Sequence, residues 1–175
     1  MSLSLPTLST ARLRLRPHRP DDFDACAALW ADPRVTQHIQ GRPQTREEVW
    51  ARLLRYAGHW AWLGFGYWAV EEGGRTIGEL GFADFKRALE PSLDGAPELG
   101  WALSPAVWGQ GYATEALTAA LAWADANLAA AETACIVALQ NAASLRVAAK
   151  LGYRETARTT YKGEATLVFW RPREL

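Results

Sequence analysis

The pattern of apolar and polar positions predicts alternating strands and helices along the chain. Residues 11–16 alternate arginine with leucine, which predicts a half-buried strand with its leucines inward and its arginines outward. The Asp pair at 21–22 is placed to cap a first helix that ends near residue 32. Thr45 and Glu48 have the spacing of a capping box, so we expect a second helix that begins there and ends at one of the glycines that follow.

The second half of the chain repeats this alternation. Gly73-Gly74 between two strand-like runs predicts a hairpin turn. We expect strands at 67–71, 75–82, 98–103, 133–140, 153–161 and 165–171, and helices at 113–127 and 144–151. Because no linker, repeat or low-complexity segment divides these elements, the pattern indicates one domain over residues 1–175, of mixed α/β or α+β class.

Composition narrows the function classes. The chain has 175 residues, 49% of them apolar, and its 19 basic and 19 acidic residues give a formal net charge of zero. This balance favours neither nucleic acid nor a charged surface as a partner. The beginning of the chain does not resemble a signal peptide, and no apolar run reaches the roughly 20 residues of a membrane span. We therefore expect no nucleic-acid partner, no membrane insertion and a cytoplasmic location.

Cysteines, histidines and tryptophans add little chemistry by themselves. Cys26 and Cys135 stand in apolar contexts, which favours buried, unpaired thiols over a disulfide. The histidines show no metal-ligand spacing with them, so we expect no metal site. Most of the nine tryptophans are expected in the core, although a cleft that binds an apolar group is an alternative use for some of them. The candidates are Trp50, Trp60, Trp62 and Trp68.

A glycine loop before the helix at 113–127 is the strongest candidate for chemistry. The segment 108–116 reads Trp-Gly-Gln-Gly-Tyr-Ala-Thr-Glu-Ala. Glycine permits positive φ and close approach of a ligand, and the first turn of a helix points unpaired N–H groups outward. Together with the helix dipole, these groups suit an anion such as a phosphate. The segment fits neither the dinucleotide-binding nor the Walker pattern, since it lacks a third glycine and a Gly-Lys-Ser/Thr.

The order of these motifs resembles one known family. Strand 98–103, the loop, a helix, strand 133–140, Asn141, a short helix and Gly152-Tyr153 together resemble a GNAT-superfamily N-acetyltransferase, in the branch of the ribosomal-protein-alanine N-acetyltransferases. The resemblance implies the acyl-CoA N-acyltransferase fold. That fold has a mixed, mostly antiparallel sheet of about six or seven strands with a central, splayed parallel pair, flanked by about four helices.

The resemblance also implies an activity and a cosubstrate. An enzyme of this family moves an acetyl group, not an aminoacyl group, from acetyl-CoA to a primary amine by direct attack in a ternary complex, and CoA is the product. The acceptor is a protein N-terminus or a small-molecule amine. The alternative is a non-catalytic sensor or scaffold that binds an acyl-CoA. Homodimers are common in the family, and the final strand with Trp170 is a candidate interface.

The positions that match the family imply the residues around acetyl-CoA. The loop differs from the family pattern Gln/Arg-x-x-Gly-x-Gly/Ala in its first place, which Trp108 occupies. A backbone N–H near the end of strand 98–103 is implied to polarise the thioester carbonyl. Asn141 is expected to bind the pantetheine amides, to cap the next helix, or to do both. The implied acetyl-CoA residues are Trp101, Ala102, Leu103, Trp108, Gly109, Gln110, Gly111, Tyr112, Ala113, Thr114, Asn141 and Ser144.

Candidate catalytic residues follow from the same comparison. Many relatives use a tyrosine to protonate the leaving thiolate, but Ala148 stands at that place here. Ser144 matches the serine that the ribosomal-protein branch places near the CoA sulfur, although a helix cap is an alternative role for it. Glu98 is the first candidate for the general base, followed by Glu164 and then Glu79, and a chain of water molecules is a further alternative.

Overall fold

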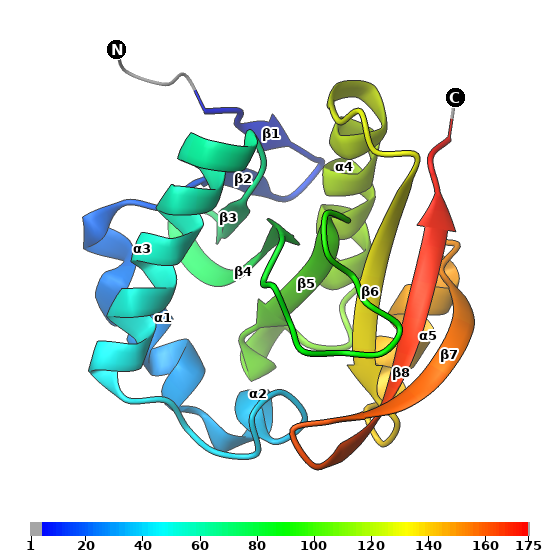
Figure 1. Cartoon of the computed structure of the whole chain (residues 1–175). Helices are drawn as coiled ribbons and strands as arrows, with labels where there is room; N and C mark the ends of the chain where they lie inside the picture. The colour runs from blue at the N-terminus through cyan, green and yellow to red at the C-terminus, as the bar shows by residue number, and fades with distance from the viewer. Residues whose placement is uncertain (1–4, 175) are drawn as a thin grey trace.

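A single sheet dominates the computed structural model, which describes residues 5–174. Its strand order is β1-β2-β3-β4-β5-β6-β8-β7, and all neighbours are antiparallel except β5 and β6 (Figure 1). The strands are β1 Leu8–Ser9, β2 Arg14–Pro17, β3 Tyr67–Glu72, β4 Arg75–Ala83, β5 Glu98–Leu103, β6 Glu132–Ala138, β7 Arg154–Tyr161 and β8 Glu164–Pro172. The helices are α1 Phe23–Ala31, α2 Pro33–Thr36, α3 Arg46–Leu63, α4 Tyr112–Asn127 and α5 Ala142–Lys150.

This architecture confirms the predicted fold, with its central parallel pair. The described residues form eight strands and five α-helices, which exceeds the predicted numbers because β1 has two residues and α2 has four. Such short elements carry too little periodicity to be seen in a sequence. No helix among the described residues combines the length and apolarity needed to cross a membrane.

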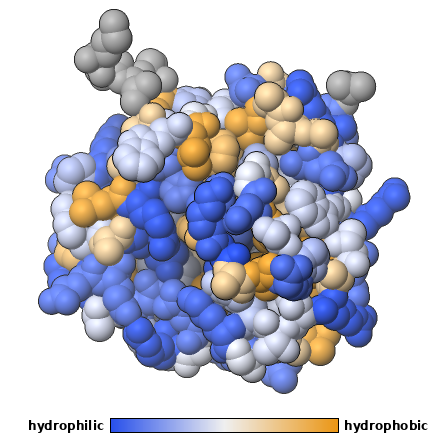
Figure 2. Space-filling view, in the orientation of Figure 1, coloured by the Kyte–Doolittle hydropathy of each residue, from blue (hydrophilic) through white to orange (hydrophobic). Residues whose placement is uncertain are grey.

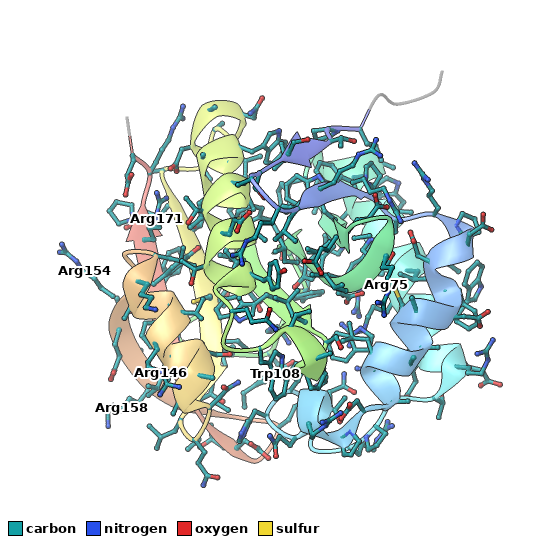
Figure 3. All side chains as sticks on the ribbon, turned by 180° about the vertical axis from the view of Figure 1, so that it is seen from behind. Arg75, Trp108, Arg146, Arg154, Arg158 and Arg171 are labelled. Atoms are coloured by element: carbon teal, nitrogen blue, oxygen red, sulfur yellow. The ribbon has the colours of Figure 1, made fainter. Side chains whose placement is uncertain are left out.

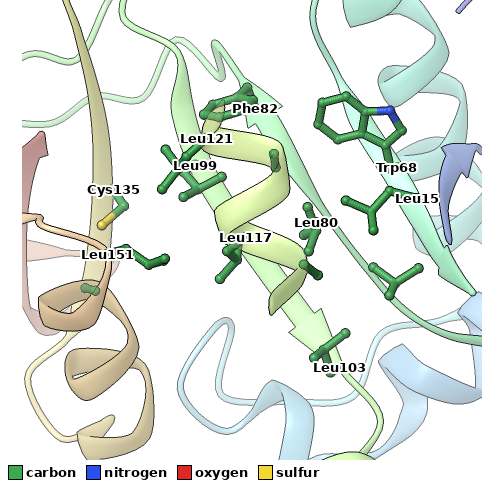
Figure 4. Packing of buried hydrophobic residues seen from close by; sticks show 14 of the residues in the cluster. Leu15, Trp68, Leu80, Phe82, Leu99, Leu103, Leu117, Leu121, Cys135 and Leu151 are labelled. Atoms are coloured by element: carbon green, nitrogen blue, oxygen red, sulfur yellow. The ribbon is translucent and has the colours of Figure 1, made fainter. Parts of the chain in front are cut away.

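Helices cover both faces of the sheet. α1 and α3 lie on the face nearer the viewer in Figure 1, and α4 and α5 lie in front when the molecule is seen from behind in Figure 3. Leu117 and Leu121 of α4 pack on Leu80 of β4 and Leu99 of β5 (Figure 4). Each of these four leucines is at most 3% exposed, so the sheet has a continuous core beneath α4.

Local sequence signals placed several element boundaries correctly. The capping box at the beginning of α3 is present: Glu48 N donates to Thr45 Oγ1 at 3.2 Å, and Thr45 N donates to Glu48 Oε2 at 2.8 Å. α3 ends at Gly64, whose φ of 74° is the left-handed conformation expected at a helix C-terminus. Cys26 and Cys135 are both buried and unpaired, as predicted.

Two predictions about side-chain direction are wrong. Arg16 does not point outward. It is 6% exposed and makes two hydrogen bonds to Asp22, at 2.7 and 2.8 Å. Asp22 therefore serves this ion pair and makes no side-chain capping bond to α1. The expected core position fails for Trp50 and Trp62, which are 42% and 89% exposed, whereas Trp60 and Trp68 are buried. Trp62 instead lines the cleft described below, which is the alternative use.

Candidate functional site

The parallel strands β5 and β6 separate soon after they meet. Their register contains a single pair, Glu98 with Ala134, at the beginning of β5. β5 remains paired with β4 along its whole length, and β6 remains paired with β8, so the sheet opens only between the two central strands. The edge of β5 that faces the opening is therefore left without a strand partner. An unpaired strand edge of this kind can accept an extended ligand.

A cleft of about 1010 Å³ adjoins this opening. It is lined by β5 and β6, by α3 on one side and by the β7–β8 hairpin on the other. Figure 2, in the orientation of Figure 1, shows many hydrophilic side chains over this face. Trp101, Asn141 and Ser144, which were predicted to contact acetyl-CoA, line the cleft, and so do the predicted base candidates Glu98 and Glu164.

The predicted anion loop has the expected backbone but lies outside this cleft. Gly109 and Gly111 have φ values of 73° and 79°, so each takes a conformation that favours glycine. The first helical hydrogen bond of α4 runs from Glu115 N to Gly111 O at 3.0 Å. The N–H groups of residues 112–114 precede that bond and are free to bind an anion at the helix N-terminus.

Trp108 links this loop to β5. Its indole Nε1 donates to Leu103 O at 2.8 Å, at the last residue of the strand. Figure 3 shows Trp108 between the end of β5 and the beginning of α4. The indole thus holds the loop against the end of β5. The family pattern has Gln or Arg at this place, so it did not suggest such a role.

Arg12 is a residue beside the loop that sequence reasoning missed. Its Nη1 donates to Gln110 O at 2.9 Å, and its Nε donates to Glu115 Oε2 at 2.6 Å. Its guanidinium also lies 4.1 Å above the centre of the Tyr112 ring. Arg12 therefore braces the loop from the segment before β2, and its charge is paired with that of Glu115 at the beginning of α4. About a hundred residues separate the partners, so no local pattern could reveal the contact.

Asn141 and Ser144, at the beginning of α5, have different roles. Asn141 Oδ1 accepts a hydrogen bond from Ser144 N at 3.1 Å, so Asn141 is the residue that caps the helix. The Ser144 hydroxyl is not used for capping and has no protein hydrogen-bond partner within residues 5–174. It lies in the wall of the cleft, where it can donate to a ligand.

The three candidate carboxylates have different surroundings. Both oxygens of Glu98 accept from Arg87, through Nε at 2.8 Å and Nη2 at 2.9 Å. Glu164 is exposed at the cleft and makes no ion pair with the described residues. Glu79 is fully buried and does not line the cleft, so the expectation that it faces this region is wrong. Its hydrogen-bond partners lie on α1 and α3, too far away in the sequence for a local pattern to reveal them.

Comparison with known proteins agrees with this arrangement. Residues 12–154 match the family model described as the acetyltransferase (GNAT) domain. The chain belongs to the GNAT acetyltransferase family. A putative GNAT-family acetyltransferase from Bordetella pertussis has the same fold, with a TM-score of 0.84, 32% identity and coverage of 95% of this chain and 99% of that one.

Two other similar proteins are informative. The FsC-acetyl coenzyme A-N(2)-transacetylase of Aspergillus fumigatus is 33% identical over 153 residues, which is 84% of this chain but only 64% of that protein. This chain thus spans just under two thirds of that relative's length. The ribosomal L7/L12 alpha-N-protein acetyltransferase RimL, solved with coenzyme A, shares the fold at a TM-score of 0.78, with 17% identity and coverage of 95% and 98%.

Tyr67 is a second residue of this GNAT domain that sequence reasoning missed. It lines the cleft, and its hydroxyl lies against Gly100 of β5, where any side chain would collide with it. Burial raises the pKa of Tyr67 far above its ordinary value, as do Glu98 and Glu79, so the hydroxyl keeps its proton. It has no hydrogen-bond partner in the described chain and is free to donate to a ligand beside β5.

One group of potential metal ligands lies next to the cleft. The ligand atoms of His18, Cys26 and Glu79 fall within 4.8 Å of one another. Burial raises the pKa of the Cys26 thiol far above its ordinary value, and the negative charge of Glu79 adds to the effect. The thiolate that binds metals is thereby disfavoured. Glu79 Oε1 accepts from Trp30 Nε1 at 3.0 Å and from the Tyr56 hydroxyl at 2.5 Å, and Glu79 Oε2 lies 3.5 Å from His18 Nε2, so we interpret the group as a packed polar cluster.

Proposed function

We propose that this GNAT domain transfers the acetyl group of acetyl-CoA to a primary amine by direct attack in a ternary complex. The observation that carries the proposal is the opening between β5 and β6. It provides an unpaired strand edge, a helix N-terminus near one end and a cleft on one side. A linear thioester can occupy the opening while an amine approaches through the cleft, which brings the two reactants together.

The chain offers suitable groups for each part of acetyl-CoA. Backbone N–H groups of residues 112–114 suit the diphosphate without the need for side-chain charge, and Gly109 and Gly111 allow its close approach. The free edge of β5, with Trp101, Ala102 and Leu103, suits the amides of pantetheine. Asn141 Oδ1 already accepts from Ser144 N, so it contributes to acetyl-CoA binding mainly by fixing the position of Ser144.

We assign the chemistry to three groups. An N–H of β5, assisted by the Tyr67 hydroxyl, stabilises the oxyanion that forms when the amine attacks the thioester. Ser144 donates a proton to the thiolate as the carbon–sulfur bond breaks. Glu164 receives the proton of the attacking amine, directly or through water. We prefer it to Glu98, since Arg87 already binds both oxygens of Glu98.

A free-thiol assay tests the proposal. Acetyl-CoA is mixed with the protein and a panel of amines that includes amino acids, peptides with free N-termini, polyamines and aminoglycosides. We expect thiol release only when an acceptor is present, together with a mass increase of one acetyl group on the acceptor. Tight binding of acetyl-CoA without thiol release across the whole panel would instead support a non-catalytic acyl-CoA sensor.

A further inference from the structure

Helix α3 presents a row of cationic side chains to the cleft. Arg52 and Arg55 lie one turn apart on this helix and both line the cavity. Arg87, from the segment after β4, lines it as well. In Figure 1, α3 and the β7–β8 hairpin lie on opposite sides of the central strands, and Glu164 of the hairpin lines the same cavity as these arginines. The amine acceptor must pass between these walls.

Arg52 is a fixed guanidinium without a carboxylate partner. It is 9% exposed and lies 3.8 Å above the centre of the Trp30 ring. Its Nε donates to Gln44 Oε1 at 3.2 Å and its Nη1 donates to the Tyr56 hydroxyl at 3.1 Å. The hydroxyl stands between Arg52 and Glu79, and no carboxylate within residues 5–174 forms an ion pair with Arg52. Its Nη2 remains free to donate into the cavity.

The positive charge of Arg55 is compensated even less than that of Arg52. It makes no ion pair or hydrogen bond through its side chain to the described chain, and its guanidinium lies 4.9 Å from the centre of the Phe85 ring. Although Arg55 is open to the cavity, burial by the surrounding walls lowers its pKa, and the charges of Arg52 and Arg87 lower it further. A cation held beside other cations in a sheltered place gains electrostatic energy when an anion enters.

The charged residues of the segment after β4, beside this row, are already paired. Glu98 holds Arg87 through two hydrogen bonds. Lys86 Nζ lies 2.7 Å from Asp84 Oδ2. Two arginines on one face of α3 therefore remain for a ligand. They match a carboxylate, whose two oxygens can accept from two guanidinium groups at once.

We infer that the amine acceptor carries a carboxylate close to its reacting nitrogen, and that Arg52 and Arg55 bind this carboxylate. This inference rests on the proposed acetyl transfer and adds the substrate class to it. Free amino acids, and peptides with an acidic residue next to the N-terminus, meet the requirement. Polyamines and aminoglycosides, which are cationic throughout, would be repelled by the same arginines.

The first test measures binding, independently of catalysis. The CoA-loaded protein is titrated by calorimetry with amino acids, each paired with its amide, and with peptides that have Asp or Asn as the second residue. The two sets distinguish a free amino acid from a peptide. We expect at least one acid to bind at least tenfold more tightly than its neutral partner. Equal affinity of acids and neutral partners throughout both sets would overturn the inference.

Variants of α3 localise the effect. Arg55→Gln, at an exposed position that should not disturb folding, is expected to reduce the preference for the acid to less than threefold. Arg46→Gln is the matched control, because Arg46 lies on the same helix, pairs with Asp24 at 3.0 Å and does not line the cleft. It should keep the full preference. A preference that survives in Arg55→Gln contradicts the inference.

The thiol-release assay separates this inference from the proposed function. Acetylation of neutral amines and their acidic partners at equal kcat/KM would leave the transferase intact and overturn the carboxylate site. If no amine is acetylated, the proposed transfer fails, and the binding preference still decides whether the arginines form an anion site. Faster acetylation of the acids in wild type, lost in Arg55→Gln with an unchanged KM for acetyl-CoA, supports both.

Discussion

Replacement of Gly111 by aspartate tests the loop by charge alone. Gly111 precedes the N-terminus of α4 with a φ of 79°, and a Cβ built there lies 3.5 Å from Arg12 Nη2, which is an ordinary contact. The substitution therefore creates no clash. It costs about 1 kcal/mol or somewhat more for the left-handed backbone conformation.

The expected loss of affinity follows from electrostatics. A carboxylate at about 5 Å from a diphosphate charge is repelled by about 1 kcal/mol in water and by about 3 kcal/mol at the lower effective dielectric of a protein surface. Two phosphate charges and screening by salt lead us to expect about 2 kcal/mol, or roughly thirtyfold weaker binding of CoA. Gly111→Asn is the matched control, because asparagine has the same shape, tolerates positive φ and carries no charge.

Calorimetric titration with CoA provides the measurement. Gly111→Asn should bind CoA within about threefold of wild type, whereas Gly111→Asp should bind it roughly thirtyfold more weakly, with the difference shrinking as salt is added. Thermal denaturation confirms that both variants are folded. If the two variants bind CoA equally well, the N–H groups of residues 112–114 do not hold the diphosphate, and the electrostatic argument is refuted.

Further predictions concern catalysis and stability. Ser144→Ala should lower kcat by about a hundredfold with little change in the KM for acetyl-CoA, because Asn141 keeps its cap; an unchanged kcat would remove Ser144 from the mechanism. Tyr56→Phe should lower the free energy of unfolding in urea by about 1–3 kcal/mol, since it removes the hydroxyl between Arg52 and Glu79, and an unchanged midpoint would contradict this. Burial raises the pKa of Asp22, but hydrogen bonds from Arg16 and from the Arg19 amide outweigh it and hold the pKa below its ordinary value. The resulting stability is present at neutral pH and is lost as the pH falls below about 4, so Asp22→Asn should melt earlier at pH 7 and show a smaller acid-induced decrease in Tm than wild type.

Local patterns in the sequence were sufficient for most of the fold. The box of Thr45 and Glu48 and the turn at Gly73-Gly74 are each decided by residues a few positions apart, and the structure has both where they were expected. Strand 98–103 was predicted with its observed bounds. Such features depend on backbone conformation and short-range hydrogen bonds, which neighbouring residues determine.

Side chains with distant partners were not predictable in this way. Arg16 alternates with leucines as a solvent-facing residue would, yet Asp22 and Glu71 draw it into the interior. The burial of Glu79 was unpredictable for the same reason, because its partners Trp30 and Tyr56 belong to helices that contact it only in the folded chain. Only the tertiary structure brings these charges to their partners.

The residues of the candidate site likewise differ in whether the sequence could reveal them. The loop and Ser144 were found because their spacing along the chain matches a family pattern, and their roles remain proposals. Arg52 and Arg55 were missed, although their spacing of three residues on a predicted helix placed them on one face. The sequence lacked the position of that face relative to β5. It also could not show that neither arginine forms an ion pair with a carboxylate of the described residues, and both facts depend on the packing of α3.

A crystal structure of the protein with bound CoA tests the central claim most directly. The account predicts that the diphosphate accepts hydrogen bonds from the N–H groups of residues 112–114, and that pantetheine runs along the free edge of β5 with its sulfur near the Ser144 hydroxyl. CoA bound elsewhere, with the loop at 109–111 empty and the opening between β5 and β6 closed by side chains, would contradict it.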